Sequence, residues 1–210
     1  MFTGIIQEIG YLKQTIFESS KKFLVISCCS LQEDLLVGES IACNGICLTV
    51  IKFSPVDIVV EIMDQTMNIT TAKNWKYKTS IHLEKALTLS SRLNGHIVQG
   101  HVDTVLSLTH KFEKNETLYL EFNFQPEFLP LVVEHGSICI DGVSLTIAQL
   151  TRQSFQVALI KHTRHNTHFC FLQVNDLVNV EFDLIGKYIA QMMPQNKSLI
   201  TEEWLKINGY

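Results

Sequence analysis

An internal duplication restricts the fold of this chain more than any other feature of its sequence. Residues 45–50 read Gly-Ile-Cys-Leu-Thr-Val, and residues 142–147, which lie 97 positions later, read Gly-Val-Ser-Leu-Thr-Ile. The same offset needs no gap between positions 40 and 84, and it is longer than a solenoid repeat. The sequence therefore predicts two related modules followed by a tail. Further matched pairs are Ser40 with Ser137, Ile41 with Ile138, Asn44 with Asp141, Thr66 with Thr163, Thr70 with Thr167 and Glu84 with Glu181.

Each module has the composition of a small β-barrel. Short segments rich in apolar and β-favouring residues are separated by Gly, Asn, Asp and Pro, which is typical of closely spaced strands. Asn44-Gly45 and Asp141-Gly142 have the composition of tight turns with positive φ. The expected strand segments are 23–29, 39–51, 56–63 and 80–83 in the first module and 117–124, 137–148, 155–160 and 178–182 in the second.

The tail has a different pattern from the modules. Residues 183–193 carry apolar side chains at helical spacing, Pro194 ends the segment, and Thr201 is suited to cap a second short helix. An apolar helix beside a barrel covers either its own barrel or the same helix of another subunit, and we favour the second. The expected domains are 1–97, 98–184 and 185–210.

The bulk composition excludes several classes of function. A net charge of −4 leaves no basic patch for nucleic acid, and no Gly-Lys-Ser/Thr loop for phosphate is present. The first residues lack the basic and apolar regions of a signal peptide, and no run of about 18 apolar residues could cross a membrane. The six cysteines keep no paired spacing, which indicates reduced thiols in a cytoplasmic protein.

A cluster of Gly and His residues, 95–103, lies at the junction of the modules. His96 and His101 share no helix face and point to opposite sides of a strand. A zinc site would need more ligands at compatible spacing, so we expect no metal. The flanking glycines favour a bend where backbone approaches a ligand, although each His taken alone suits a hydrogen-bonded structural role.

Small polar residues repeat on one face of equivalent strands. Cys47 and Thr49 share a face in the first module, as Ser144 and Thr146 do in the second. Such a face is either exposed to solvent or forms a ligand wall, and its presence in both modules favours the wall.

The modules also differ, which predicts two similar pockets that treat two similar ligands differently. The unlike pairs are Cys47 with Ser144, Asn44 with Asp141, and Gly4 with His101.

Four motifs resemble the riboflavin synthases of the α-chain type. They are residues 1–6, 44–50, 95–103 and 140–146, and together with the duplication and the tail they cover nearly the whole chain. The resemblance implies an all-β fold of two similar six-stranded antiparallel barrels of the Greek-key type in tandem, followed by a C-terminal α-helix.

The resemblance also implies an activity. Proteins of this family are homotrimers joined through their C-terminal helices, and each active site lies between the N-terminal barrel of one subunit and the C-terminal barrel of its neighbour. Two molecules of 6,7-dimethyl-8-ribityllumazine bind there, and transfer of a four-carbon unit gives riboflavin and 5-amino-6-(D-ribitylamino)uracil. This transferase reaction, the last step of riboflavin biosynthesis, uses no cofactor or metal, and lumazine synthase is a further partner to consider.

By position, the resemblance assigns catalytic roles to Ser144, His101, Thr146 and Cys47. Ser144 with His101 would deprotonate a lumazine methyl group, and Cys47 would assist at the other ring. One pocket would use Cys47, Leu48, Thr49, Glu61, Ile62, Met63, Asp64, Gln65 and Thr66. The other would use Gly4, Ile5, Ile6, Gly100, His101, Val102, His135, Ser144, Leu145, Thr146, Ile160, Lys161, His162, Thr163, Arg164 and His165.

Three positions depart from the family pattern. His135 stands where the family usually has Lys, so this site would carry a charge only part of the time near neutral pH, and ligand affinity there would rise as the pH falls. Gln65 replaces the common Glu and Lys161 the common Pro, which leaves the ribityl contacts open.

Two other functions are compatible with such a sequence. A non-catalytic lumazine- or flavin-binding paralogue would have the same duplicated form with one degraded pocket. The presence of both polar pairs and of His101 favours the enzyme. The flavin barrel of an oxidoreductase would require a nicotinamide-binding α/β domain after the barrel.

Overall fold

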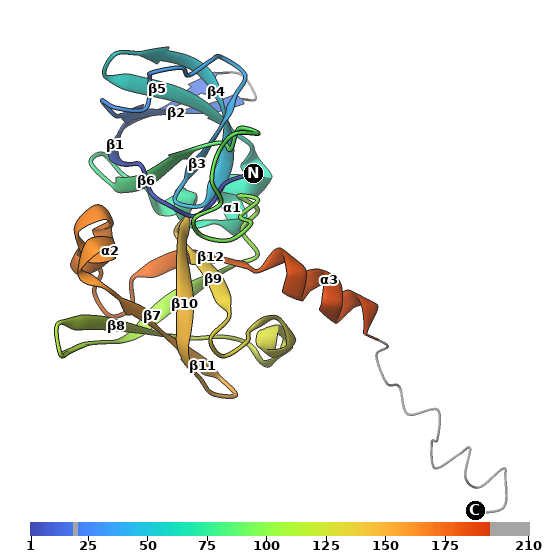
Figure 1. Ribbon diagram of the computed structural model, residues 1–210. Coiled ribbons are helices and arrows are strands. Elements are labelled where there is room, and N and C mark those ends of the chain that lie inside the picture. Colours follow the sequence, from blue (N-terminus) through green and yellow to red (C-terminus); the bar gives the residue numbers. More distant parts are fainter. Residues whose placement is uncertain (19–20, 194–210) are drawn as a thin grey trace, which may run out of the picture.

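The computed structural model describes residues 1–18 and 21–193, which form two closed antiparallel barrels (Figure 1). The strand order is β1-β2-β5-β4-β3-β6 around the first barrel and, read from β7, β7-β8-β11-β10-β9-β12 around the second. The two orders are equivalent, so the predicted pair of six-stranded barrels is confirmed, and a helix, α3, follows them.

The six strands of the two barrels correspond one to one, as do α1 with α2 and η1 with η3, whereas η2 has no counterpart in the first barrel. The first barrel contains β1 (Glu8–Glu18), β2 (Lys21–Ser27), β3 (Ser40–Cys43), β4 (Ile46–Ser54), β5 (Asp57–Ile62), α1 (Asp64–Ile69), the 3-10 helix η1 (Thr71–Asn74) and β6 (Ser80–Lys85). The second contains β7 (Thr104–Lys114), β8 (Thr117–Asn123), η2 (Pro126–Leu131), β9 (Ser137–Ile140), β10 (Val143–Leu150), β11 (Ser154–Leu159), α2 (Lys161–Asn166), η3 (His168–Phe171) and β12 (Leu177–Phe182).

Alternation of side chains along the strands builds each core. In β5 the side chains of Ile58, Val60 and Ile62 are buried, and the residues between them are partly exposed. Register shifts in β1, β4, β7 and β10 occur at equivalent places in the two barrels. Such bulges bend a strand and help a small sheet to close.

The sequence pattern missed β1 and β7. In β1 only Gly10 and Leu12 are buried, and the second half of the strand carries exposed polar and charged residues, so its alternation is weak. The pattern also missed α1 and α2, which are too short to develop a helical periodicity.

The predicted tight turns are confirmed, and they face one another between the barrels. Asn44, Gly45, Asp141 and Gly142 all have positive φ, from 43° to 82°. A Cβ atom added to Gly45 would lie 2.7 Å from the backbone nitrogen of Gly142, and one on Gly142 would lie 2.8 Å from that of Gly45. The two glycines thus let the turns meet at a local twofold axis that relates the barrels.

Residues from both repeats fill the space beside these turns. Phe2 and Val98 form an isolated antiparallel bridge, with N···O distances of 2.7 and 3.1 Å. Both side chains are buried and pack with Ala42 and Cys139, which are themselves related by the repeat.

Helix α3 (Leu184–Met192) projects from the second barrel (Figure 1). It confirms the helix expected over 183–193, and the Asp183 side chain caps it by accepting a hydrogen bond from Ile185 N at 2.9 Å. Pro194, the second helix expected at Thr201 and most of the 185–210 tail lie outside the described residues. No described helix is long and apolar enough to cross a bilayer.

Candidate functional site

Each barrel's polar strand is bordered by chain from the other repeat. Cys47 N on β4 donates a hydrogen bond to Gly100 O at 2.9 Å, and Ser144 N on β10 donates to Gly4 O at 2.7 Å. Residues 2–6, which precede the first barrel, therefore lie against the second barrel, and residues 98–102 lie against the first. We call these two stretches the crossing segments.

A buried glutamate holds each crossing segment. The Glu84 carboxylate accepts hydrogen bonds from Thr3 N at 2.7 Å, Thr3 Oγ1 at 2.6 Å and Gly4 N at 3.0 Å. The Glu181 carboxylate accepts from the backbone nitrogens of residues 99, 100 and 101 at 2.7, 2.9 and 3.0 Å. Burial raises the pKa of both carboxyls, and these hydrogen bonds oppose the shift. The duplication marked this pair of glutamates, but not their role.

The paired clamps correct one match made from the sequence. Gly4 corresponds to Gly100, with φ of 77° and 82°, and not to His101. The offset is one residue shorter before β3 than after it, because the link from β2 to β3 is one residue shorter than the link from β8 to β9. The residue equivalent to His101 is therefore Ile5.

A pocket of about 300 Å³ lies beside Cys47, and we call it the N-pocket. Strand β4, helix α1 and a crossing segment form its walls. Six of the predicted site residues meet here, and three others complete the lining. The predicted ones are Cys47, Gln65, Thr66, Gly100, His101 and Val102, and the others are Ile46, Ile69 and Thr70.

Within a single chain, residues 100–102 do not lie beside Ser144, so their grouping in one site stays a prediction for neighbouring subunits. Their segment lies against Cys47, since Gly100 O accepts from Cys47 N and His101 lines the N-pocket. The sequence could not reveal this, because the crossing segments exchange barrels through contacts between distant residues.

The region of the second barrel that is related to the N-pocket by the repeat surrounds Ser144, whose backbone nitrogen is bonded to Gly4 O, and we call it the C-pocket. Here the partner of Ser144 is His96: Ser144 Oγ lies 2.7 Å from His96 Nδ1. His96 is buried, and burial lowers the pKa of its imidazole while Asp183 opposes the shift. The neutral ring can therefore accept the Ser144 proton. The expected pairing of Ser144 with His101 does not occur within one chain.

The predicted residues of β4 and β10 divide by face. Cys47 and Ser144 are half-buried, and Thr49 and Thr146 are exposed. Leu48, Leu145 and Ile62 belong to the barrel cores, so only their backbone is available to a ligand.

Several other predicted residues are engaged elsewhere or remain exposed. Glu61 pairs with Lys21 at 3.0 Å and Asp64 with Lys22 at 2.7 Å. Both terminal guanidinium nitrogens of Arg164, Nη1 and Nη2, donate to the Glu113 carboxylate. The side chains that remain exposed are those of Ile5, Met63, His135, Ile160, Lys161, His162 and His165, and Ile6 and Thr163 are half-buried.

The glycines flanking the junction histidines allow a close approach of protein to protein, where we expected a ligand. A Cβ atom on Gly95 would lie 2.1 Å from Thr3 O, and one on Gly100 would lie 2.5 Å from Cys47 Cβ. These glycines seat the crossing segments tightly against their barrels.

The thiols differ in what chemistry they could support. Burial raises the pKa of Cys43 and Cys139 above the usual thiol value, and raises that of Cys28 to about 12, so these three are packing residues. Cys47 is the thiol that lines the N-pocket. Within 1–18 and 21–193, no group of three or more His, Cys, Asp or Glu side chains could hold a metal ion.

Comparison with known proteins gives consistent matches along the whole chain. The lumazine binding domain family matches twice, over residues 3–86 and 99–183. The riboflavin synthase of Bacillus subtilis (strain 168) is 37% identical over 215 residues, with 100% of both chains covered. That of Schizosaccharomyces pombe is 34% identical over 210 residues, with 98% of each chain covered.

Solved structures with the same fold include LumP in two ligand complexes. LumP complexed with riboflavin gives a TM-score of 0.79 at 23% identity, over 87% of this chain and 99% of LumP. LumP complexed with 6,7-dimethyl-8-(1'-D-ribityl) lumazine gives a TM-score of 0.76 at 22% identity, with the same coverage. These matches establish a common fold.

Proposed function

The chain belongs to the riboflavin synthase family of duplicated lumazine-binding-domain proteins, and from this we propose that it converts two molecules of 6,7-dimethyl-8-ribityllumazine into riboflavin and 5-amino-6-(D-ribitylamino)uracil. The reaction is a group transfer: one lumazine gives a four-carbon unit to the other, and the atoms of the two substrates equal those of the two products.

One observation carries the proposal: the chain has two equivalent pocket regions with unlike polar groups. Cys47 faces the first, and Ser144 with His96 faces the second. Two identical substrates need two similar pockets, and they need different surroundings if one is to donate carbon atoms and the other is to accept them.

The reaction requires accurate placement of the two lumazine molecules and a weak base. The C7 methyl group of the lumazine is acidic because its carbanion delocalises into the ring, so a neutral imidazole or a polarised hydroxyl is a sufficient proton acceptor. We assign the acceptor to Ser144 supported by His96, with Thr146 beside it. Cys47 and His101 then act on the ring in the N-pocket.

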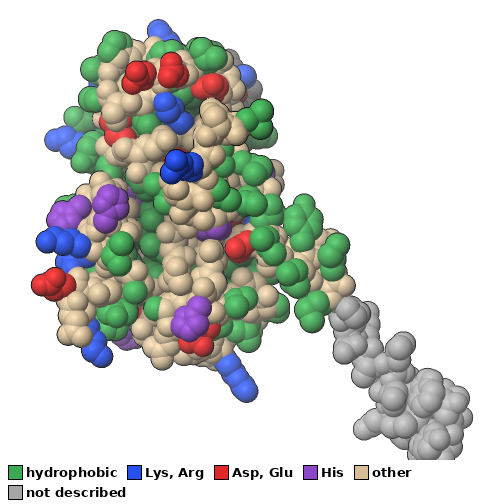
Figure 2. Space-filling view, viewed as in Figure 1, with side chains coloured by type: hydrophobic (Ala, Val, Ile, Leu, Met, Phe, Trp, Pro, Cys, Tyr) green, Lys and Arg blue, Asp and Glu red, His purple; other side chains and the backbone are tan. Residues whose placement is uncertain are grey.

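We propose that the active site forms between subunits of a homotrimer. Within one chain His101 lines the pocket of the first barrel and Ser144 belongs to the second barrel, so an N-pocket of one subunit facing a C-pocket of the next would bring them to the same pair of substrates. Helix α3 supports this assembly, because Ile185, Tyr188, Ile189 and Met192 form an apolar stripe and are each more than half exposed (Figure 2).

A cytoplasmic location agrees with the six free cysteines of the described chain. The most direct partner is the enzyme that supplies the lumazine, and we propose that the protein associates with lumazine synthase, which co-purification tests.

The experiment is to add 6,7-dimethyl-8-ribityllumazine to the purified protein and follow riboflavin by absorption and fluorescence. We expect riboflavin and the aminouracil in equal amounts, and strong loss of turnover in His101→Gln. Tight lumazine binding without product would instead assign the chain to the non-catalytic binding proteins. Absence of both binding and turnover would refute the proposal.

A further inference from the structure

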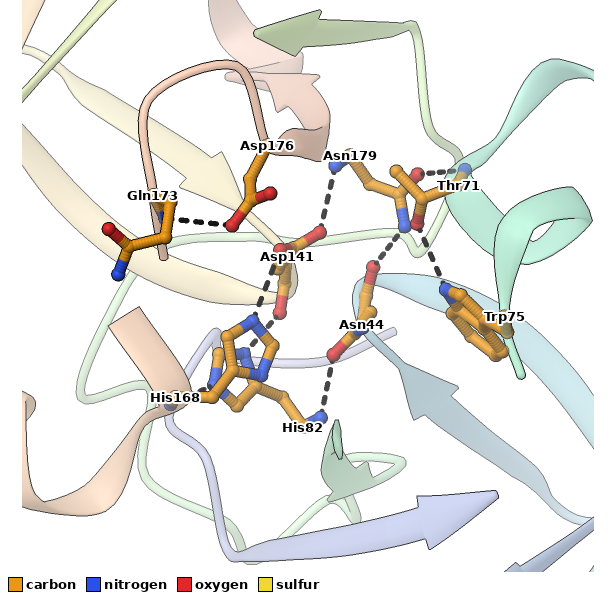
Figure 3. Close-up of polar contacts among 9 residues, drawn as sticks. All are labelled: Asn44, Thr71, Trp75, His82, Asp141, His168, Gln173, Asp176 and Asn179. Atoms are coloured by element: carbon orange, nitrogen blue, oxygen red, sulfur yellow. Dashed lines mark hydrogen bonds and ion pairs between the residues drawn. The ribbon is translucent and has the colours of Figure 1, made fainter. Parts of the chain in front are cut away.

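One side chain ties each tight turn to its own barrel, Asn44 in the first and Asp141 in the second. Asn44 Oδ1 accepts a hydrogen bond from His82 N on β6 at 2.6 Å. Asp141 Oδ1 accepts one from Asn179 N on β12 at 2.8 Å. His82 and Asn179 are related by the repeat, so the local twofold axis of the molecule runs through this cluster (Figure 3). We call the four residues Asn44, His82, Asp141 and Asn179 the joint.

The side chain of Asn179 crosses from the second barrel to the first. Its Nδ2 donates to Asn44 O at 2.8 Å, and its Oδ1 accepts from Thr71 N at 2.8 Å. One amide therefore fixes both the turn and the start of η1 in the opposite barrel.

His82 makes the same pair of contacts in the reverse direction. Its Nδ1 lies 2.9 Å from Asp141 O, and its Nε2 accepts a hydrogen bond from His168 N at 2.9 Å. His168 N belongs to a backbone amide, which can only donate, so Nε2 carries no proton. Nδ1 must then carry the proton and donate it to Asp141 O. In this one tautomer the imidazole presents a donor and an acceptor just as the amide of Asn179 does.

We propose that His82 is a positioning residue that holds the two barrels, and with them the Cys47 and Ser144 pockets, in one mutual orientation, and that it does so only as the neutral Nδ1–H tautomer. The catalytic part of this inference rests on the proposed function, and the structural part does not. A proton on Nε2 would make this atom a donor that faces another donor, the His168 amide, and would break the hydrogen bond between them. We call the contacts of the His82 and Asn179 side chains across the barrels the two arms of the joint. The amide side chain of Asn179 does not take up a proton, so acid would weaken the contacts on one side of the local twofold axis and leave those on the other side intact.

The surroundings of His82 disfavour a second proton. The His168 ring is stacked on it with centroids 3.7 Å apart, and the edge of Phe169 lies 5.3 Å away. The nearest carboxylate, Asp141, directs Oδ2 towards His168 Nε2 at 3.4 Å, and Glu84 on the same strand is bound to the first crossing segment. Burial, with a contribution from His168, holds the pKa of His82 well below the usual value.

The pH dependence follows from this arrangement. In the unfolded chain His82 takes up a proton near pH 6.5, whereas in the folded protein it stays neutral to lower pH. Folded protein is therefore lost as the pH falls below 6.5, and the unfolding constant rises by up to about tenfold per pH unit for this one group. His96 acts in the same direction, and Glu84 and Glu181 in the opposite one, so only a comparison of variants isolates His82.

The test compares His82→Asn, His82→Ala and Asn179→Ala with the unchanged protein. Asn at position 82 restores one donor and one acceptor without a titratable group. We expect His82→Asn to fold and bind riboflavin as the unchanged protein does near pH 7.5, and to lose less folded protein and less binding on acidification to about pH 5. His82→Ala leaves two backbone groups unpaired and should raise the unfolding constant at least tenfold. Asn179→Ala is the matched control: it weakens the other arm and should keep the acid dependence.

A long-range ¹H–¹⁵N NMR spectrum reads the tautomer directly, with a protonated Nδ1 and a bare Nε2 expected for His82 at neutral pH. An Nε2–H tautomer would overturn the proposal, and so would equal acid dependence in His82→Asn and the unchanged protein. If the unchanged protein neither binds nor converts lumazine, the proposed function fails, while NMR and unfolding still decide the structural role of His82.

Discussion

Glu84 and Glu181 illustrate how single buried groups organise this molecule. Each carboxylate lies in an environment that disfavours charge, and each is retained by three hydrogen-bond donors of a crossing segment. Replacing the carboxyl group therefore weakens the hold on the whole segment that borders a pocket, not merely one contact.

We expect Glu84→Gln and Glu181→Gln each to lower the free energy of unfolding by about 1–3 kcal/mol near neutral pH, because an amide offers one acceptor where the carboxylate offers two. The raised pKa fixes the sign of the pH effect. The folded protein binds the extra proton between the ordinary and the raised value, so the unchanged protein gains stability as the pH falls through that window. The Gln variants lack this gain, and urea unfolding should give a larger deficit near pH 4 than near pH 8. An equal deficit at both pH values would contradict the assignment.

The two variants should also affect ligand binding in different pockets. Glu181 holds the segment that carries His101, and Glu84 holds the one beside Ser144. Titration with riboflavin should therefore show two classes of binding site. Glu181→Gln should weaken binding to the N-pocket, and Glu84→Gln should weaken binding to the C-pocket. Loss of the same class in both variants would mean that the clamps do not act on separate pockets.

At the scale of elements, the meeting of the two tight turns decides how closely the barrels approach. A side chain at position 45 would have to displace the backbone of Gly142 as well as adopt a positive φ. Gly38 provides a matched control, since it also has a positive φ, of 94°, but a Cβ there would meet no atom within 4 Å.

We expect Gly38→Ala to cost about 1 kcal/mol of unfolding free energy from backbone strain alone. Gly45→Ala should cost several times more, because the joint must open to admit the new methyl group. Chemical denaturation of the two variants measures the difference. Equal costs would show that the turns can move apart freely.

The elements also mark where sequence reasoning reaches its limit. The repeat, the tight turns and the strands with strong alternation were predictable, because local pattern encodes them. Strand β1 was not, because polar residues blur its alternation. The exchange of the crossing segments and the pairing of His96 with Ser144 were not predictable either, because they depend on contacts between residues 48 or more positions apart. The domain limits at 97/98 and 184/185 and the catalytic roles remain predictions.

At the scale of the whole molecule, the site that we propose between subunits has a consequence that can be measured by mixing. Ser144→Ala subunits have a defective C-pocket and an intact N-pocket, and Cys47→Ser subunits the reverse. If the site lies between subunits of a trimer as proposed, neither variant alone contains a complete site, but a mixed trimer contains some. We expect turnover to appear after the two variants are unfolded and refolded together. Activity no greater than the sum of the separate proteins would place each site within one chain.

The exposed stripe of α3 is the second feature at this scale. Ile189→Asp places a charge in the middle of the stripe, and we expect it to shift the protein from trimer to monomer in analytical ultracentrifugation, with loss of turnover. Gln191→Asp, on an exposed position beside the stripe, is the control and should leave the trimer intact. Full activity of a monomeric Ile189→Asp protein would contradict the inter-subunit site.

The crossing segments make the halves of this protein mutually dependent. Each repeat contributes one border of the pocket in the other repeat. A substitution near residue 4 therefore alters the pocket of the second repeat, and one near residue 100 alters that of the first. A duplicated gene usually frees one copy to drift. Here the exchange ties the two copies together, because each crossing segment must fit the barrel of the other copy, while Cys47 and Ser144 still make the two pockets different.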